Sequence, residues 1–218
     1  MKISLRLTNV LGLIATVIVS SGLCGAAVIY DSGITALTTS DPLQEGRLFR
    51  DGNPSSWATQ KAFPGITTPD FGYLYNTYTL TNVLYPYIQV TIDDVSGTGL
   101  TFASAYLGSY DPGARGANNG LDINYLGDAG ASGNYFGTDP RAFQVIAPVH
   151  DTLVVVVNGT GTAAVPAVGQ PYRILVEGFT DTSFDDTIPE PASVGLTGSA
   201  LAGVTIAAFL RRRKLTSN

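Results

Sequence analysis

The chain has 218 residues, of which 44% are hydrophobic and only 13% are charged, with 25 glycines, 12 prolines, one cysteine and one histidine. The single cysteine and the single histidine argue against a Cys/His zinc site and against a catalytic Cys–His or Ser–His pair. The low charge content argues against a cytosolic helical bundle, and the many tyrosines and glycines favour strands and turns.

Charge is segregated along the sequence. All 17 acidic residues lie between Asp31 and Glu190, and the stretch from Ala27 to Glu190 has six basic residues, which gives it a net charge of −11. Such an acidic segment repels phosphate backbones, so we expect no nucleic-acid partner. The other six basic residues lie near the two ends of the chain, beside apolar segments.

The N-terminal segment has the order of a secretory signal peptide. Lys2 and Arg6 precede an apolar run over residues 10–19, and small residues follow as far as Ala27. Ten apolar residues are too few to span a bilayer, which takes about 20. We therefore predict a signal peptide over residues 1–26, with cleavage after Ala26 or one residue later.

A second interpretation of this segment is a lipoprotein signal with Cys24 as the lipidated residue. Leu23 stands before that cysteine, where a small residue would be required, so the secretory signal is favoured. Cleavage after Ala26 leaves no cysteine, and the mature protein then depends on its core rather than on disulfides.

Residues 27–187 are predicted to form one extracytoplasmic domain of short strands. In Tyr87–Asp93, Ile88, Val90 and Ile92 alternate with polar residues, as in a strand with one buried face. The five apolar residues 153–157 predict a central strand covered on both faces. We expect seven or eight strands, including segments 46–50, 73–80, 87–93, 101–110, 143–145, 153–157 and 174–176. The expected fold is an all-β, antiparallel, jelly-roll-like β-sandwich.

The domain also resembles a recurring bacterial secreted module. The segments that carry the resemblance are residues 46–56, 103–112 and 124–130, the Val-rich strand through Asn158, and residues 172–178. They are similar in layout to pre-peptidase C-terminal and CUB-like β-sandwich modules. The resemblance implies an accessory or binding module rather than a catalyst. Many such modules carry cysteine pairs, but no cysteine would remain here after signal cleavage. The resemblance therefore implies nothing about disulfides in this chain.

Residues with side-chain oxygens gather in and after the segment 111–122. They could supply the six to eight oxygen ligands of Ca²⁺. The segment lacks the Asp-x-Asp-x-Asp-Gly spacing, Arg115 adds a positive charge, and the same residue types also form turns. A calcium site and a plain turn both remain possible interpretations, and no other cofactor is expected. The candidate ligands are Asp111, Asn118, Asn119, Asp122 and Asp128.

Other features suggest a carbohydrate ligand or, more weakly, an enzyme. Aromatic side chains suit sugar binding because they are amphipathic. A glycosidase needs a carboxylate pair, but with 17 acids some close pair is inevitable. Glu177 is readily explained as a surface partner of Arg173, His150 as a solvated turn residue, and the sequon at Asn158 as a hairpin turn. No enzymatic activity is expected. The aromatic candidates are Trp57, Tyr85, Tyr87, Tyr106, Tyr110, Tyr125 and Tyr135.

The C-terminal segment 188–218 has the three parts of a membrane signal. A Pro-Glu-Pro motif (Pro189, Glu190, Pro191) precedes an apolar stretch over residues 194–210, which as a helix would reach about 25 Å, near the lower limit for a bilayer span. The basic cluster that follows should stay cytoplasmic and leave the domain outside. This cluster comprises Arg211, Arg212, Arg213 and Lys214.

This order of motif, apolar helix and basic cluster resembles the PEP-CTERM sorting signal of bacterial exosortase substrates. The resemblance implies a transient inner-membrane anchor, cleavage near the motif by exosortase, and a final place at the cell surface or in the extracellular matrix. The function it implies is a non-catalytic structural or binding role in association with extracellular polysaccharide. The alternatives are a carbohydrate-binding or adhesive module, which Ca²⁺ could assist, and, less favoured, a glycoside hydrolase.

Overall fold

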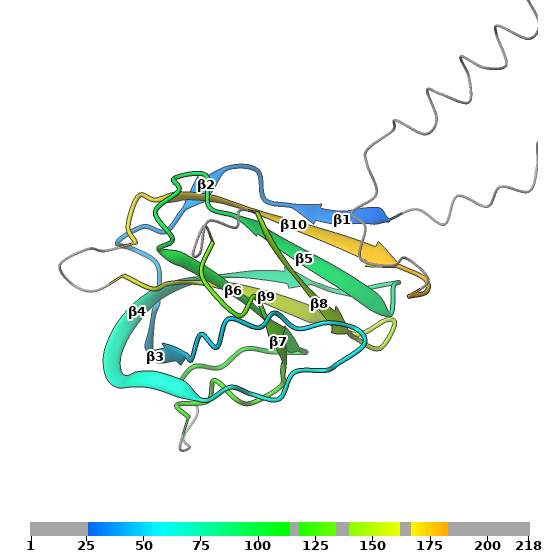
Figure 1. The fold of residues 1–218 in the computed structure, drawn as a ribbon, viewed down its shortest axis with the longest axis horizontal. Helices are drawn as coiled ribbons and strands as arrows, with labels where there is room; N and C mark the ends of the chain where they lie inside the picture. Colours follow the sequence, from blue (N-terminus) through cyan, green and yellow to red (C-terminus); the bar gives the residue numbers. More distant parts are fainter. Residues whose placement is uncertain (1–25, 114–117, 134–139, 162–166, 183–218) are drawn as a thin grey trace, which may run out of the picture. The chain divides into compact units, whose positions relative to one another are not determined.

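The computed structural model describes residues 26–113, 118–133, 140–161 and 167–182, and these residues form strands and no helix. The strands build two antiparallel sheets (Figure 1). In chain order they are β1 (Ala27–Asp31), β2 (Thr35–Ala36), β3 (Leu43–Leu48), β4 (Ile66–Leu80), β5 (Tyr87–Asp93), β6 (Thr101–Leu107), β7 (Tyr125–Asp128), β8 (Arg141–Ile146), β9 (Leu153–Gly159) and β10 (Pro171–Phe179).

The first sheet has the order β1-β10-β5-β8, with the short β2 also paired to β10, and the second has the order β3-β4-β9-β6-β7. Successive strands often cross from one sheet to the other, so most pairs in a sheet are distant in the sequence. The all-β, antiparallel prediction is confirmed. The strands β1, β2 and β7 were not among the segments expected from the sequence.

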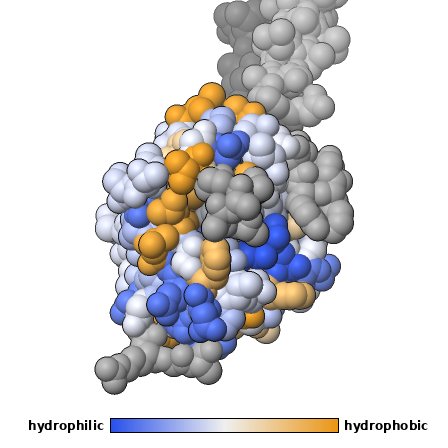
Figure 2. Space-filling view, turned by 90° about the vertical axis from the view of Figure 1, so that its left-hand side faces the viewer, coloured by the Kyte–Doolittle hydropathy of each residue, from blue (hydrophilic) through white to orange (hydrophobic). Residues whose placement is uncertain are grey.

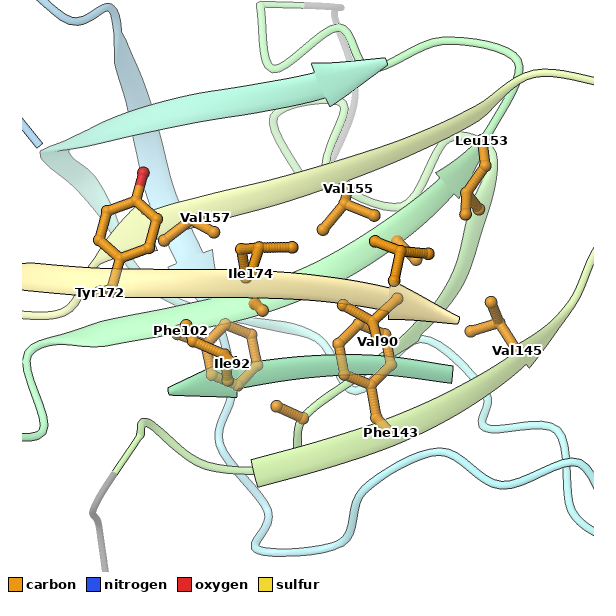
Figure 3. Packing of buried hydrophobic residues seen from close by; sticks show 14 of the residues in the cluster. Val90, Ile92, Phe102, Phe143, Val145, Leu153, Val155, Val157, Tyr172 and Ile174 are labelled. Atoms are coloured by element: carbon orange, nitrogen blue, oxygen red, sulfur yellow. The ribbon is translucent and has the colours of Figure 1, made fainter. Parts of the chain in front are cut away.

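The core lies between the two sheets, and β5, β9 and β10 contribute residues to it from alternating positions. Ile88, Val90 and Ile92 of β5 are all buried, as their alternation predicts. Ile174 of β10 and Val155 of β9 meet them from neighbouring strands and from the opposite sheet (Figure 3). Burying a side chain of this size is worth about 1.5–3 kcal/mol, so this layer accounts for much of the folding free energy.

Strand β9 is buried along its whole length, which confirms that it is a central strand covered on both faces. Val155 faces the main core, whereas Val154 and Val156 belong to a second, smaller cluster around Tyr106. This second cluster explains why no polar residue interrupts the apolar run of β9 before Asn158.

A long irregular segment, residues 49–65, joins β3 to β4 and closes one side of the sandwich; we call it the strap (Figure 1). Ser55 N donates to Asp128 O at 3.0 Å, and Gln144 N donates to Ser55 O at 2.9 Å. Asp128 ends β7 at one edge of the second sheet, and Gln144 lies in β8 at one edge of the first. The strap therefore bonds to an edge of each sheet at Ser55, and it covers part of each edge against pairing with another chain.

The surface of the domain is mixed in character. Figure 2 shows one side of the molecule, where hydrophobic residues form small patches between hydrophilic ones. The most exposed large hydrophobic residues include Ile34, Leu84 and Leu43, which come from three separate parts of the chain. Single exposed apolar side chains of this kind are ordinary in soluble domains.

Candidate functional site

A row of polar side chains crosses the outer face of the first sheet. Glu177 of β10, Gln89 of β5 and Gln144 of β8 lie opposite one another in register. Gln89 Nε2 donates to Glu177 Oε2 at 3.4 Å, and Gln144 Nε2 donates to Gln89 Oε1 at 3.2 Å. Because an amide NH₂ group has two donors, each of these nitrogens keeps a second N–H for another partner. The row can thus bond further polar groups placed above the sheet.

The strap lays an aromatic ring beside this row. Trp57 N donates to Gln144 Oε1 at 3.3 Å, and its indole Nε1 donates to Ile88 O at 3.1 Å. The indole ring packs edge-to-face against Tyr87 at 5.7 Å and against Phe179 at 5.0 Å between centroids. Trp57 is therefore held in place by the hydrogen bonds of its backbone N–H and its indole N–H and by two aromatic rings.

We call the resulting area the Trp57 surface. Its members are all partly accessible to solvent and come from three strands and the strap. Aromatic rings pack on the apolar faces of sugars, and amides and carboxylates bond sugar hydroxyls, so the composition suits a carbohydrate. The members of the Trp57 surface are Trp57, Tyr87, Gln89, Gln144 and Glu177.

Three of the aromatic residues singled out in the sequence lie elsewhere, in the second core cluster. The ring of Tyr106 lies 4.6 Å from that of Tyr110 and 6.0 Å from that of Tyr125. Tyr106 is fully buried, and burial raises the pKa of all three phenols. These rings pack the outer side of β9 and β6 and give no open platform for a sugar.

The aromatic candidates therefore do not form one exposed surface. Trp57 and Tyr87 remain at the surface, whereas Tyr85 packs so closely on Gly178 that a Cβ there would overlap its ring. Tyr135 lies outside the described residues. Sequence reasoning singled out Trp57 and Tyr87 but missed the polar row, which becomes visible only when the register of three strands is known.

The candidate calcium ligands are each engaged in local contacts. Asn118 Nδ2 donates to Asp122 Oδ2 at 3.1 Å, and Asp111 Oδ1 accepts from Gly113 N at 3.2 Å. The Asp111 contact is typical of an Asx turn, which holds a loop without a metal. Within the described residues, no three His, Cys, Asp or Glu side chains gather closely enough to hold an ion.

Asn119 joins the predicted loop to the edge of the second sheet. Its Nδ2 donates to Glu45 O at 3.1 Å and to Pro69 O at 3.0 Å. These carbonyls flank an irregularity in the β3–β4 pairing, where residues 68–71 bulge out of β4. Asn119 also has φ +52, a left-handed conformation that asparagine tolerates better than most residues. Its role in the structure is to fill the bulge.

Asp128, the last candidate ligand, is buried and paired with a lysine. Lys61 Nζ lies 2.7 Å from Asp128 Oδ1 and 2.7 Å from Asp51 Oδ1, and it donates to Asn53 O at 2.8 Å. The three donors of the ammonium group are therefore all used. Tyr125 donates its hydroxyl to the other oxygen of Asp128. The candidate ligands thus lie in four separate contacts rather than around one point.

Two aspartates, Asp51 and Asp128, share the ammonium group of Lys61. Desolvation raises the pKa of Asp128, and the hydrogen bond from Lys61 opposes that rise. Asp128 has 0% of its surface exposed, so no substrate can reach it. The cluster is suited to anchoring the strap to β7, because it neutralises a buried charge inside the fold.

Two expectations about single residues are wrong. Arg173 does not pair with Glu177; its Nε and Nη2 donate to Asp31 of β1, at 2.8 and 2.5 Å. This contact lowers the pKa of the Asp31 carboxyl to about 2. Asn158 lies in β9 with 1% of its surface exposed, not in a hairpin turn.

His150 lies in an exposed turn, as expected from its place in the sequence. Its Nδ1 is 2.9 Å from Asn82 Oδ1, and both residues have positive φ angles, 70° and 56°. Its neighbour in this contact is an amide, not a carboxylate or a nucleophile, so the geometry of a catalytic base is not present at this turn.

The predicted signal peptide up to residue 25 and the sorting segment 188–218, with its motif, apolar stretch and basic cluster, lie outside the described residues. Among the residues that are described, no helix is long and apolar enough to cross a membrane. Comparison with known protein families, with curated proteins and with solved structures finds no match to this chain.

Proposed function

We propose that this chain is an exported, non-catalytic protein of a bacterial surface or matrix, and that its β-sandwich binds extracellular polysaccharide through the Trp57 surface. The observation that carries the binding role is the fixed indole of Trp57 beside the Gln144–Gln89–Glu177 row. The observation that supports the proposed sorting to the cell surface is the C-terminal sequence, in which a Pro-Glu-Pro motif, an apolar stretch and a basic cluster follow in order.

The strand order supports the jelly-roll form of the sandwich. Strands β1, β10, β5 and β8 face β4, β9, β6 and β7, and β3 extends the second sheet. Jelly rolls with two sheets and Greek-key connections occur among lectin domains. A fold alone does not give a function, so the proposal depends on the residues of the Trp57 surface.

The proposed route to the surface has three steps. The signal peptide exports the chain, the basic cluster stops its transfer across the inner membrane, and the Pro-Glu-Pro region is presented to exosortase. Nine residues separate Phe179, the last residue of β10, from Pro189. A fully extended chain of that length could reach about 30 Å, which is long enough for the proposed cleavage. Pro189 and Pro191 lack the N–H groups needed to pair in a sheet, so the motif stays accessible.

The binding role is tested with the purified full-length protein on immobilised extracellular polysaccharide from its own host. The wild type is expected to be retained, and Trp57→Ala to lose most of the retention. Gln89→Ala serves as a second variant, because it removes polar contacts without removing the ring that holds the strap. Ile123→Ala, which truncates an exposed apolar residue on another loop, should be retained like the wild type. Wild-type protein that passes through the matrix would refute the binding role.

The proposed sorting and processing are tested by measuring the intact mass of the protein recovered from its host and by sequencing its terminal peptides. A C-terminus near Pro191 without the basic cluster supports exosortase processing. Surplus mass at that end would mark an attached lipid or glycan. A C-terminus at Asn218 would overturn the sorting proposal and leave a tail-anchored membrane protein.

A further inference from the structure

The hydrogen bonds of the polar row on the Trp57 surface all run in one direction. Trp57 N can only donate, so Gln144 points its Oε1 toward the strap and its Nε2 toward Gln89. Gln89 accepts through its Oε1 and donates through its Nε2 to Glu177, whose carboxylate can only accept. The backbone donor at one end and the carboxylate at the other therefore fix the orientation of both amide groups.

Each side chain of the row keeps hydrogen-bonding capacity for a ligand. The row uses one N–H of each glutamine amide and one oxygen of Glu177, so a second N–H on each amide and the Glu177 Oε1 stay outside it. All three side chains are partly accessible to solvent. The row thus presents two oriented donors and one charged acceptor. A hydroxyl group suits both kinds of position because it donates and accepts, whereas a ligand carboxylate suits only the donors.

The charge around the row is negative. The five members of the Trp57 surface include an acid and no basic residue. Arg173 lies on the same face of β10, about 13 Å along the strand from Glu177, and its guanidinium donates to Asp31. Arg141 of β8 pairs with Ile92, whose side chain is buried in the core, so this position belongs to the inner face of the sheet. A ligand on the described part of the row therefore meets the Glu177 carboxylate without a neighbouring cation.

The row is extended across the strands of the first sheet. Neighbouring strands lie about 4.8 Å apart, so Glu177 and Gln144, which are two strands apart, are separated by about 10 Å. The indole of Trp57 lies beside the row, against Tyr87. A ligand that contacts the row and the indole together is elongated, has many hydroxyls and has one apolar face. Consecutive units of a glycan chain have these properties.

We propose that the Trp57 surface is specific for uncharged glycan chains, and that Glu177 sets this specificity by accepting sugar hydroxyls and repelling the carboxylates of uronic acids. The net charge of −11 on residues 27–190 acts in the same direction at longer range. This inference rests on the proposed function, because it takes the Trp57 surface as the binding site, and it adds the class of glycan and the residue that selects it.

The test separates the extracellular polysaccharide of the host into neutral and acidic fractions by anion exchange, immobilises each, and measures retention of the purified full-length protein at physiological salt. The wild type is expected to be retained by the neutral fraction and to pass through the acidic one. Glu177→Gln should gain affinity for the acidic fraction by about tenfold or more, because like charges at an interface oppose binding. It should still bind the neutral fraction, since a glutamine oxygen also accepts from Gln89 and from hydroxyls.

Asp93→Asn is the matched control. It removes the same charge from the same face of β5, about 13 Å along the strand from Gln89. That distance exceeds the Debye length of about 8 Å at physiological salt, so retention on both fractions should stay as in the wild type.

The outcomes distinguish this inference from the proposed function. Retention of the wild type on the acidic fraction, with or without retention on the neutral one, would overturn the specificity and leave the binding role standing. A Glu177→Gln variant that gains nothing on the acidic fraction would also overturn it, because the carboxylate would then not be what excludes acidic chains. Passage of the wild type through both fractions, or retention on the neutral fraction that survives Trp57→Ala, would instead refute the binding role of the Trp57 surface itself.

Discussion

Ala27, the first residue of β1, pairs with Gly178, the last but one residue of β10. The beginning and the end of the folded domain therefore lie side by side, at the same end of the sandwich (Figure 1). The predicted cleavage site after Ala26 stands directly before this pair, with no linker between them. Both predicted membrane signals are therefore joined to the same end of the folded domain.

Gly178 is needed at this position because Tyr85 occupies the space of a side chain. A Cβ on Gly178 would overlap the Tyr85 ring. We expect Gly178→Ala to lower the free energy of unfolding by about 1–3 kcal/mol, the usual cost of overpacking a core. Gly72→Ala is the matched control, since its Cβ would meet only Leu43 at an ordinary 3.6 Å. Chemical denaturation of both variants checks this, and equal stabilities would contradict it.

Lys61 is predicted to be the main support of the strap. Lys61→Met leaves Asp128 buried without its cation, which should lower the free energy of unfolding by about 3–5 kcal/mol at neutral pH. Asp128→Asn in the Lys61→Met background removes the unpaired charge and should recover part of the loss. A double variant as unstable as Lys61→Met, measured by urea denaturation, would show that the ion pair is not the cause.

The same variant should change how stability depends on pH. Desolvation already raises the pKa of Asp128, and the Lys61→Met substitution removes the hydrogen bond and the positive charge that oppose this rise. The folded variant then holds a proton that the unfolded chain has lost, so its stability is greatest below the unfolded pKa of 3.8 and falls as pH rises through the folded value. Urea denaturation of Lys61→Met at several pH values measures this slope. A flat profile would contradict it.

The Asp31–Arg173 pair should show the opposite dependence. The hydrogen bonds from Arg173 and from Gly33 lower the pKa of Asp31 to about 2, from 3.8. The stabilisation is therefore present above pH 3.8 and is lost as the pH falls toward 2. NMR titration of the Asp31 carboxyl is expected to give a low pKa that rises toward 3.8 in Arg173→Gln. An unchanged value would mean that the Gly33 N–H alone lowers it.

Much of the fold could be predicted from hydrophobic periodicity. The segment Tyr87–Asp93 has the same bounds in the sequence prediction and in the structure, because strict alternation marks a strand with one buried face. The burial of β9 on both faces also follows from its unbroken apolar run. The strand β7 was missed because Tyr125–Asp128 is short and ends in a charged residue, a pattern typical of a turn. The structure shows that this aspartate is buried because it pairs with Lys61.

The candidate site could be predicted only in part, because it depends on long-range pairing. Gln89 and Glu177 are separated by 88 positions, and only the strand order places them together. Sequence proximity suggested Arg173 as the partner of Glu177, but β1 brings Asp31 closer to that arginine.

At His150, a role in the stability of the turn can be distinguished from a role in polysaccharide binding. His150 has φ 70°, a conformation that costs about 1–2 kcal/mol for an ordinary residue and nothing comparable for glycine. His150→Gly should therefore be close to the wild type in stability, because relief of this strain offsets the lost contact with Asn82. His150→Val should lower the melting temperature clearly, since a β-branched residue fits this conformation poorly. Both variants should retain host polysaccharide as the wild type does, because the turn lies outside the Trp57 surface. Loss of retention in a stably folded His150→Gly would instead make this histidine part of the binding site.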